Sequence, residues 1–176
     1  TIEYPTEFML TGRNGESGLC LQRNVDSHDE FQSGISDALR SYPSKSNNIL
    51  FIGEILDSVT ATAAIKSAID GHLVFSTMHA GSVIMALERI ISLATPYIGN
   101  EEAKQILGSG LRLVICQSLK TIRGRTVLNG QYLIDTIKAS QTIQNSQSIK
   151  HLSTELQNQE VKLETGQQII SRGEAQ

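Results

Sequence analysis

The sequence LFIGEILDSVTATAAIKSAIDGHLVFSTMHA, residues 50–80, decides the fold class of this chain. It begins with a continuous apolar run, continues through an acidic turn and a stretch of helical periodicity, and ends with a second apolar run. Continuous apolar runs of this length are typical of strands that are covered on both faces in a parallel sheet. A strand, a helix and a second strand at this spacing form a right-handed βαβ unit. We therefore expect an α/β fold with a mostly parallel sheet flanked by helices.

The helix patterns around this stretch support the same fold class. Residues 26–42 carry apolar side chains at helical spacing, with Asp26 or Ser27 as the N-cap and Pro43 just past the end. The helix predicted over residues 58–71 stops at Gly71, and both apolar runs beside it are predicted to be buried strands. The face of this helix that we expect to pack is formed by Val59, Ala63, Ala64, Ala68 and Ile69.

The second half of the chain is predicted to be more helical. A helix is expected over residues 81–94, and residues 100–119 suggest two short helices broken near Gly108 and Gly110. Two strands are expected around the Arg-Gly-Arg turn of residues 119–135. The remaining residues are rich in Gln and Ser, and their weak helical periodicity predicts small helices packed on the edge of the core. Their low apolar content also allows a partly mobile tail. The domains expected on this basis are a core over 1–135 and a helical extension over 136–176.

Composition excludes only a few classes of protein. The formal net charge is -3 and the isoelectric point is about 5.8, so no overall basic field favours nucleic acid as a partner. No segment approaches the length of about 18 apolar residues that a membrane span needs. Cys20 and Cys116 lie in apolar surroundings, which favours buried free thiols in a reducing compartment such as the cytoplasm.

Glu54 and His79 are the residues in this stretch best placed for chemistry. Ligands of open parallel sheets bind beyond the carboxyl ends of the strands, and Glu54 directly follows the first apolar run, as His79 follows the second. An acid in this position can hold Mg²⁺ or orient water at a phosphate, although capping of the next helix explains a lone Glu54 about equally well. His72 begins the second strand at its opposite end, and a hydrogen bond to a backbone carbonyl is an alternative role for it. A zinc site is disfavoured, because no second ligand lies at short spacing.

Together these motifs resemble the Walker B and His boxes of the secretion ATPase superfamily. This superfamily comprises the type II and type IV secretion motors and the ATPases that assemble or retract type IV pili. The matching residues are Glu54, Asp57, Gly71, His72, Thr77 and His79. The opening sequence TIEYPTEF, residues 1–8, resembles the acidic box of the same superfamily, and the resemblance extends over about residues 1–135.

The resemblance implies a RecA-like domain that binds ATP and Mg²⁺. It implies that Glu54, Glu7 and His79 are catalytic, and that Glu54 and Glu7 lie near Mg²⁺, in part through water. Glu3 is implied to lie near Mg²⁺ together with Glu7. The residues implied in binding the nucleotide cofactor are Glu3, Asp57, Thr77 and His72. Of these, His72 is better assigned to bracing the sheet or a subunit interface.

At the level of the whole protein, the resemblance implies a motor that couples ATP hydrolysis to pilus assembly or retraction, or to secretion. The expected form is a homo-hexamer at the cytoplasmic face of a bacterial inner membrane. A platform protein of the pilus or secretion system would hold it there in place of a membrane span of its own. Nucleic acid is not an expected partner.

The sequence also departs from the pattern of the superfamily. Tyr4 stands where the acidic box usually has Asp, and Leu56 replaces a common Arg. The chain contains no G-x-x-x-x-G-K-[ST] P-loop, which lies upstream of the acidic box in the superfamily. We therefore expect the second part of an ATPase domain, inactive alone. The alternative is a non-catalytic module for ring assembly or partner docking, and a DNA-translocating relative is weaker because no basic stripe is evident.

Overall fold

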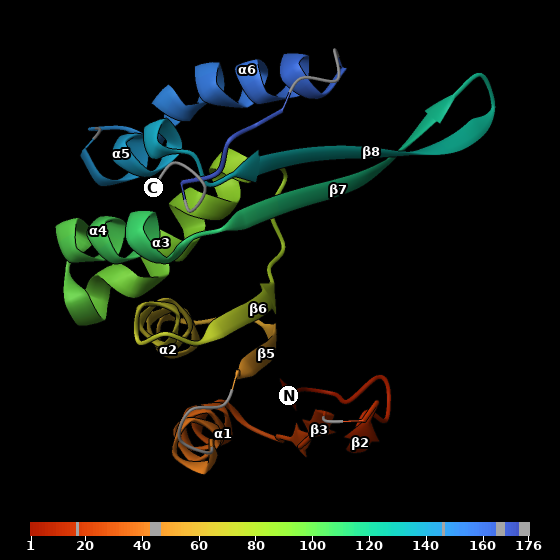
Figure 1. The fold of residues 1–176 in the computed structure, drawn as a ribbon, viewed down its shortest axis with the longest axis vertical. Helices are drawn as coiled ribbons and strands as arrows, with labels where there is room; N and C mark the ends of the chain where they lie inside the picture. Colours follow the sequence, from red (N-terminus) through yellow and green to blue (C-terminus); the bar gives the residue numbers. More distant parts are fainter. Residues whose placement is uncertain (17, 43–46, 146, 165–167, 173–176) are drawn as a thin grey trace. The chain divides into compact units, whose positions relative to one another are not determined.

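The computed structural model describes residues 1–16, 18–42, 47–145, 147–164 and 168–172. The chain divides into two compact units, Thr1–Met78 and His79–Gln176, which are described one at a time (Figure 1). A parallel four-stranded sheet with helices packed beside it forms the first unit, and the second unit is largely helical. The predicted α/β class is confirmed, whereas the predicted domain division after residue 135 stays a prediction.

The sheet of the first unit has the strand order β4-β1-β5-β6, and its three neighbouring pairs are all parallel. The strands are β1 Ile2–Glu3, β4 Arg23–Asn24, β5 Ile49–Glu54 and β6 Leu73–Thr77. Because the strands run the same way, Glu3, Glu54 and Thr77 end their strands at the same edge of the sheet. Ile2 and Ile52 are paired in register and fully buried, and they anchor the core beneath this edge.

Two helices, α1 His28–Ser41 and α2 Ser58–Ile69, lie beside the sheet and contact each other (Figure 1); α1 packs against β1 and α2 against β6. The Ser27 hydroxyl caps α1 by accepting a hydrogen bond from the Glu30 amide at 3.4 Å, which confirms one of the two predicted N-caps. The predicted stop at Pro43 lies outside the described residues. Gly71 has φ +95°, a left-handed conformation that favours glycine, so it ends the turn after α2 as predicted.

The predicted packing face of α2 is wrong except at Ala64. The residues that α2 buries are Thr60, Ala61, Ala64, Ile65 and Ser67. Small residues occur on every side of this helix, so periodicity alone does not distinguish its faces. Contact with the neighbouring elements decides the orientation.

Strand β6 is also less covered than predicted. It is the last strand of the sheet, and the side chains of Leu73 and Phe75 are 47% and 52% exposed. An apolar run indicates burial on both faces only where other elements cover both faces. The short hairpin of β2 Gly12–Asn14 and β3 Gly18–Cys20 agrees with the strand ends predicted near the start of the chain.

The second unit contains α3 Val83–Ile98, α4 Asn100–Gly110, β7 Leu113–Ile122, β8 Arg125–Ile134, α5 Ile137–Asn145, η1 Ile149–His151 and α6 Leu152–Glu164. Strands β7 and β8 form an antiparallel hairpin around the predicted Arg-Gly turn. The small helices predicted for the tail are present as α5, η1 and α6. Among the described residues, no helix has the length and apolar character that crossing a membrane requires.

The prediction of two short helices over residues 100–119 is wrong. A single helix, α4, ends at Gly110, and β7 begins at Leu113 because it pairs with β8 along its whole length. Gly108 does not break α4 but allows close packing, since a Cβ atom there would lie 2.5 Å from Gln144 Cγ and 3.0 Å from the Ser140 carbonyl oxygen. Cys20 and Cys116 are free, as predicted, but both are only half-buried.

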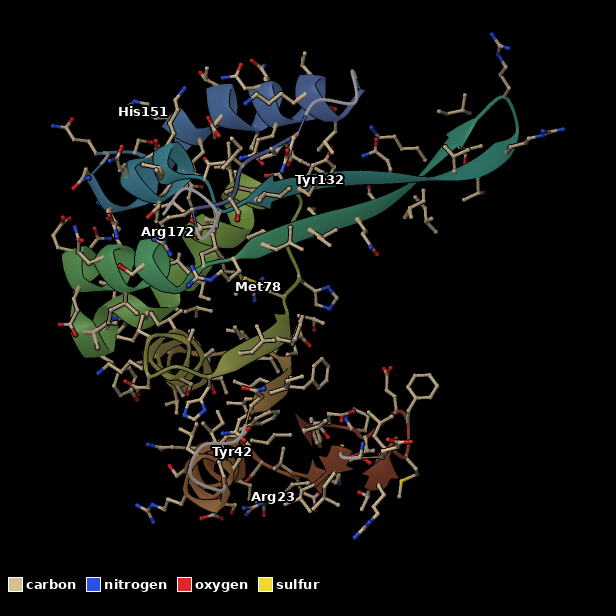
Figure 2. All side chains as sticks on the ribbon, in the orientation of Figure 1. Arg23, Tyr42, Met78, Tyr132, His151 and Arg172 are labelled. Carbon is tan, nitrogen blue, oxygen red and sulfur yellow. The ribbon has the colours of Figure 1, made fainter. Side chains whose placement is uncertain are left out.

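A cluster of two arginines and one aspartate lies at the base of the β7–β8 hairpin. The Asp135 side chain is 3% exposed, and its carboxylate lies 3.0 Å from Arg112 and 3.2 Å from Arg172. Arg172 also donates to the Gly108 carbonyl and the Ser140 hydroxyl, each at 2.8 Å (Figure 2). Burial raises the pKa of Asp135, and the two guanidinium groups act in the opposite direction. The cluster therefore attaches residue 172 to the end of α4.

Candidate functional site

Glu54 lies at the carboxyl edge of the first unit's sheet, where β5 ends. A bulge between Ile52 and Glu54 shifts the register, so that Glu54 is paired with Thr77 at the end of β6. The Thr77 hydroxyl donates to the Gly53 carbonyl at 2.5 Å, and the Ile55 amide donates to the Thr77 carbonyl at 2.9 Å. These bonds join the two strand ends. The structure therefore brings Glu54 and Thr77 together, as the strand pattern predicted.

Glu3 lies beside Glu54 because β1 and β5 are neighbours. Its side chain is 8% exposed and passes over Gly53, where a Cβ atom would lie 3.4 Å from both Cα and Cγ of Glu3. The buried carboxylate accepts a hydrogen bond from Gln22 Nε2 at 3.1 Å. The sheet thus places two carboxylates, Glu3 and Glu54, on adjacent strand ends.

Gln22 and Asn24 are site residues that the sequence analysis missed. They hold the loop of residues 4–10, in which the exposed Glu7 lies. Gln22 donates to the Phe8 carbonyl at 2.6 Å and accepts from the Leu10 amide at 2.8 Å. The side-chain carbonyl of Asn24 accepts from the amide and the hydroxyl of Thr6 at 3.1 and 3.2 Å. No local pattern could have identified these residues, because their partners in this loop are 12 to 18 positions away.

Asp57 caps helix α2. Its carboxylate accepts hydrogen bonds from the amide and the hydroxyl of Thr60, both at 2.7 Å, while the Asp57 amide donates to the Thr60 hydroxyl at 3.3 Å. This reciprocal arrangement is a capping box. The capping bonds give Asp57 a structural role, and its predicted part in cofactor binding stays a prediction.

His72 lies at the opposite end of β6 from Thr77. Its ring packs against Tyr42 with the ring centroids 5.2 Å apart and the ring planes tilted by 33°, and its amide donates to the Ser67 carbonyl at 3.2 Å. Tyr42 in turn donates to the Ile49 carbonyl at 3.1 Å, and burial raises the pKa of this tyrosine (Figure 2). These contacts hold the start of β6, and both the bracing role and the part in cofactor binding predicted for His72 stay predictions.

His79 is the first residue of the second unit and is exposed there. Its backbone carbonyl accepts a hydrogen bond from Arg89 Nη1 at 2.9 Å, which ties the chain before α3 to the helix itself. The contact fixes the backbone of His79. It leaves the predicted catalytic role of the imidazole as a prediction.

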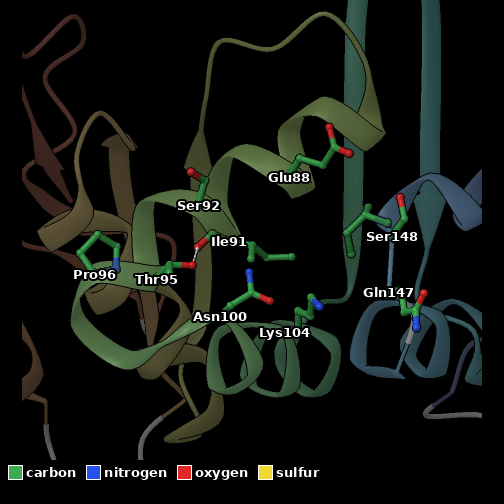
Figure 3. A pocket seen from close by; sticks show the side chains of 10 residues that line it. Glu88, Ile91, Ser92, Thr95, Pro96, Asn100, Lys104, Gln147 and Ser148 are labelled. Carbon is green, nitrogen blue, oxygen red and sulfur yellow. Dashed lines mark hydrogen bonds between the residues drawn. The ribbon is translucent and has the colours of Figure 1, made fainter.

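A cavity of about 460 Å³ lies within the second unit, between α3, the start of α4 and the segment that precedes η1 (Figure 3). Its walls include Glu88, Ile91, Lys104 and Ile149, and none of the predicted site residues lines it. The candidate site of the first unit is therefore separate from this cavity.

The carboxylates at the sheet edge suit Mg²⁺ better than a metal that needs a full set of protein ligands. Within the described ranges, no three His, Cys, Asp or Glu side chains lie close enough to hold a metal ion. Mg²⁺ is usually held by one or two carboxylates, with substrate phosphates and water completing its octahedral shell. Glu3 and Glu54 fit that limited contribution.

Comparison with known proteins decides the family. The profile of the family described as "Type II/IV secretion system protein" matches residues 1–159. This chain belongs to the type II/IV secretion system protein family.

Curated relatives in this family are ATPases of pili and secretion systems. The chain is 34% identical over 139 residues to the type IV pilus retraction ATPase PilT of Pseudomonas aeruginosa, covering 77% of this chain and 38% of that protein. It is 31% identical over 121 residues to the type IV pilus assembly ATPase PilB of Myxococcus xanthus, covering 68% and 20%. It also matches the type II secretion system protein E of Pseudomonas aeruginosa, at 31% identity over 68% of this chain and 22% of that protein. The chain therefore spans between a fifth and two fifths of these family members.

Two solved structures share the fold of this chain. The crystal structure of the pilus retraction motor PilT with bound ADP matches 96% of this chain and 49% of that chain, with a TM-score of 0.73 and 27% identity. The ATPase DotB of Yersinia pseudotuberculosis matches 92% of this chain and 40% of that chain, with a TM-score of 0.65. At 23% identity, the second likeness supports the fold alone.

Proposed function

We propose that this chain forms the carboxylate side of the nucleotide site in a motor ATPase of the secretion family. The observation that carries the proposal is the placement of Glu3 and Glu54 on adjacent ends of parallel strands, at the edge where such sheets bind ligands. Family membership and the ATPases among the relatives support ATP as the ligand.

In this proposal Glu54 is the main catalytic carboxylate, and Glu7 and His79 complete the catalytic group. Glu54 and Glu7 would hold Mg²⁺, in part through water, with the Glu3 carboxylate close to the same ion, and bound Mg²⁺ would neutralise charge on the phosphates. Glu54 would also orient the attacking water. The proposed nucleotide contacts are Glu3, Asp57, Thr77 and His72.

The phosphates of ATP need a further binding element. The 176 residues contain no P-loop motif, so we propose that a P-loop outside this sequence supplies the backbone amides and the lysine that hold the phosphates. We expect the 176-residue chain alone to show negligible ATPase activity. Robust hydrolysis by a pure preparation of this chain would contradict that part of the proposal.

The proposed biological role is to couple ATP hydrolysis to type IV pilus assembly or retraction, or to protein secretion. The active form would be a RecA-like homo-hexamer at the cytoplasmic face of a bacterial inner membrane. Its partner there would be the platform protein of the pilus or secretion system. The names of the relatives support this role.

The test is the Glu54→Gln variant of a protein that carries both this chain and its P-loop. The change removes the charge and the proton-accepting ability of one carboxylate while preserving its size. We expect hydrolysis to be abolished and nucleotide binding to be retained, with the exposed Glu160→Gln on α6 as the matched control. Near-normal hydrolysis by Glu54→Gln would remove Glu54 from its role. If the wild-type protein formed rings but did not hydrolyse ATP, the result would instead favour the alternative of a non-catalytic module for ring assembly or partner docking.

A further inference from the structure

We infer that Gln22 is a positioning residue that sets the Glu3 carboxylate and the loop of residues 4–10 for metal and nucleotide binding. The inference rests on the proposed function and assigns a role to a residue outside the acidic, Walker B and His boxes. Its basis is the hydrogen-bond network of one side-chain amide in the first unit.

The amide of Gln22 uses both its donor and its acceptor groups. Nε2 donates to Glu3 Oε1 at 3.1 Å and to the Phe8 carbonyl at 2.6 Å, and Oε1 accepts from the Leu10 amide at 2.8 Å. Two acceptors on one side and one donor on the other define the orientation of the amide. Gln22 therefore links the end of β1 to the loop that contains Glu7.

The chemistry of the Glu3 site favours a neutral donor at this position. A buried carboxylate needs a hydrogen-bond donor, and Glu3 is 8% exposed. A lysine or arginine would satisfy Glu3 but would also neutralise the charge that attracts a cation. The amide of Gln22 orients the carboxylate and leaves its negative charge in place.

The neighbouring arginine is directed elsewhere. Arg23 lies next to Gln22 in the sequence, but its guanidinium lies 2.7 Å from the Asp37 carboxylate and donates to the Ser33 hydroxyl at 3.3 Å. This ion pair holds the cationic side chain of Arg23 on α1. At this strand end the side chain of Gln22, and not that of Arg23, donates to Glu3.

The first test measures the loop in the 176-residue chain by amide hydrogen exchange. Gln22→Leu removes both donors and the acceptor at nearly constant size, and Gln32→Leu on the exposed face of α1 is the matched control. We expect faster exchange at the Leu10 amide in Gln22→Leu. The Thr6 amide, which Asn24 holds, should change less. Unchanged exchange at Leu10 would overturn the inference, whatever the catalytic result.

The second test measures hydrolysis in the protein that also carries the P-loop. We expect Gln22→Leu to lower kcat and raise the Mg²⁺ concentration needed for half-maximal rate, each by about tenfold or more, as for a lost hydrogen bond to a charged group. The KM for ATP at saturating Mg²⁺ should change much less. An unchanged Mg²⁺ requirement in Gln22→Leu would overturn the positioning role. A wild type that does not hydrolyse ATP would instead refute the proposed function, and the exchange measurement would then decide the role of Gln22.

Discussion

Gly53 lies so close to Glu3 that a Cβ atom at position 53 would be 3.4 Å from both Cα and Cγ of the glutamate. The Gly-Glu pair at the end of β5 therefore has two separate tasks. Glu54 supplies a carboxylate, and Gly53 lies against the Cα and Cγ atoms of Glu3 on the neighbouring strand, where a side chain larger than alanine would have to displace them.

The loss of unfolding free energy on substitution of Gly53 should depend sharply on the size of the new side chain. Alanine would just reach van der Waals contact with Glu3, so Gly53→Ala should cost about 1 kcal/mol of unfolding free energy or less. The branched side chain in Gly53→Val would displace Glu3, and we expect a loss of about 2–3 kcal/mol. Urea denaturation measures both values. Equal stability of the two variants would show that the contact with Glu3 does not limit position 53.

Asp57 offers a way to separate helix capping from cofactor binding. Asp57→Ala removes the capping bonds to Thr60 and should lower the unfolding free energy by about 1–2 kcal/mol. Asp57→Asn keeps a side-chain oxygen for the cap and should cost little stability. If Asp57→Asn nevertheless loses nucleotide affinity, its charge acts on the cofactor; full affinity in this variant would restrict Asp57 to the cap.

Arg172 should contribute to stability far more than an ordinary residue near the end of a chain. Its side chain is 23% exposed and it contacts Asp135, Gly108 and Ser140. Arg172→Met keeps much of the apolar stem but removes these charged hydrogen bonds, which should cost about 2–3 kcal/mol in urea denaturation. The exposed Lys150→Met in η1 is the control and should change stability by less than about 0.5 kcal/mol. A similar small effect for Arg172→Met would show that the cluster does not stabilise the second unit.

Asp135 should make stability depend on pH in the direction opposite to that of most ion-paired carboxylates. Burial raises the pKa of Asp135 in the folded chain, so the folded state retains a proton that the unfolded state releases. The contribution of Asp135 should be fully present below a pH of about 4 and should be lost as pH rises through the folded pKa. The loss of unfolding free energy in Asp135→Asn relative to wild type should therefore be larger below a pH of about 4 than above the folded pKa of Asp135.

A series of denaturation curves measured at different pH values, for both proteins, checks the Asp135 prediction. The quantity to compare is the difference in unfolding free energy between wild type and Asp135→Asn. Arg172→Met should extend to higher pH the range in which Asp135 contributes to stability, because removing one guanidinium removes a cause that lowers the pKa of Asp135. A difference that grows as the pH rises would contradict the sign of the predicted effect.

Sequence patterns that span only a few residues predicted a large part of the fold. The apolar run before Glu54 and the glycine stop at Gly71 each depend on residues within a few positions, and both were predicted from the sequence; Ser27 was one of the two residues predicted to cap α1. The parallel sheet followed from the spacing of strands and helices. It placed Glu54 and Thr77 at one edge because parallel strands end at the same side.

Apolar runs and small-residue patterns gave wrong predictions where contacts between distant elements decide the secondary structure or the buried face. Residues 113–119 were predicted as helix but form part of β7, because β8 offers a partner along the whole strand. The face of α2 was predicted incorrectly because alanine and threonine suit several orientations equally. Gly108 was interpreted as a break but provides space for Gln144.

By itself, the sequence determined the α/β class, the order of most elements and the acidic residue at the end of β5, because periodicity, capping and turn chemistry act over a few residues. Only the tertiary structure decided which distant groups meet. Gln22 binds Glu3 across 19 positions and Arg172 binds Gly108 across 64, and no local pattern encodes such a contact. These hydrogen bonds form because folding brings buried polar groups together, where each must find a partner once water is excluded.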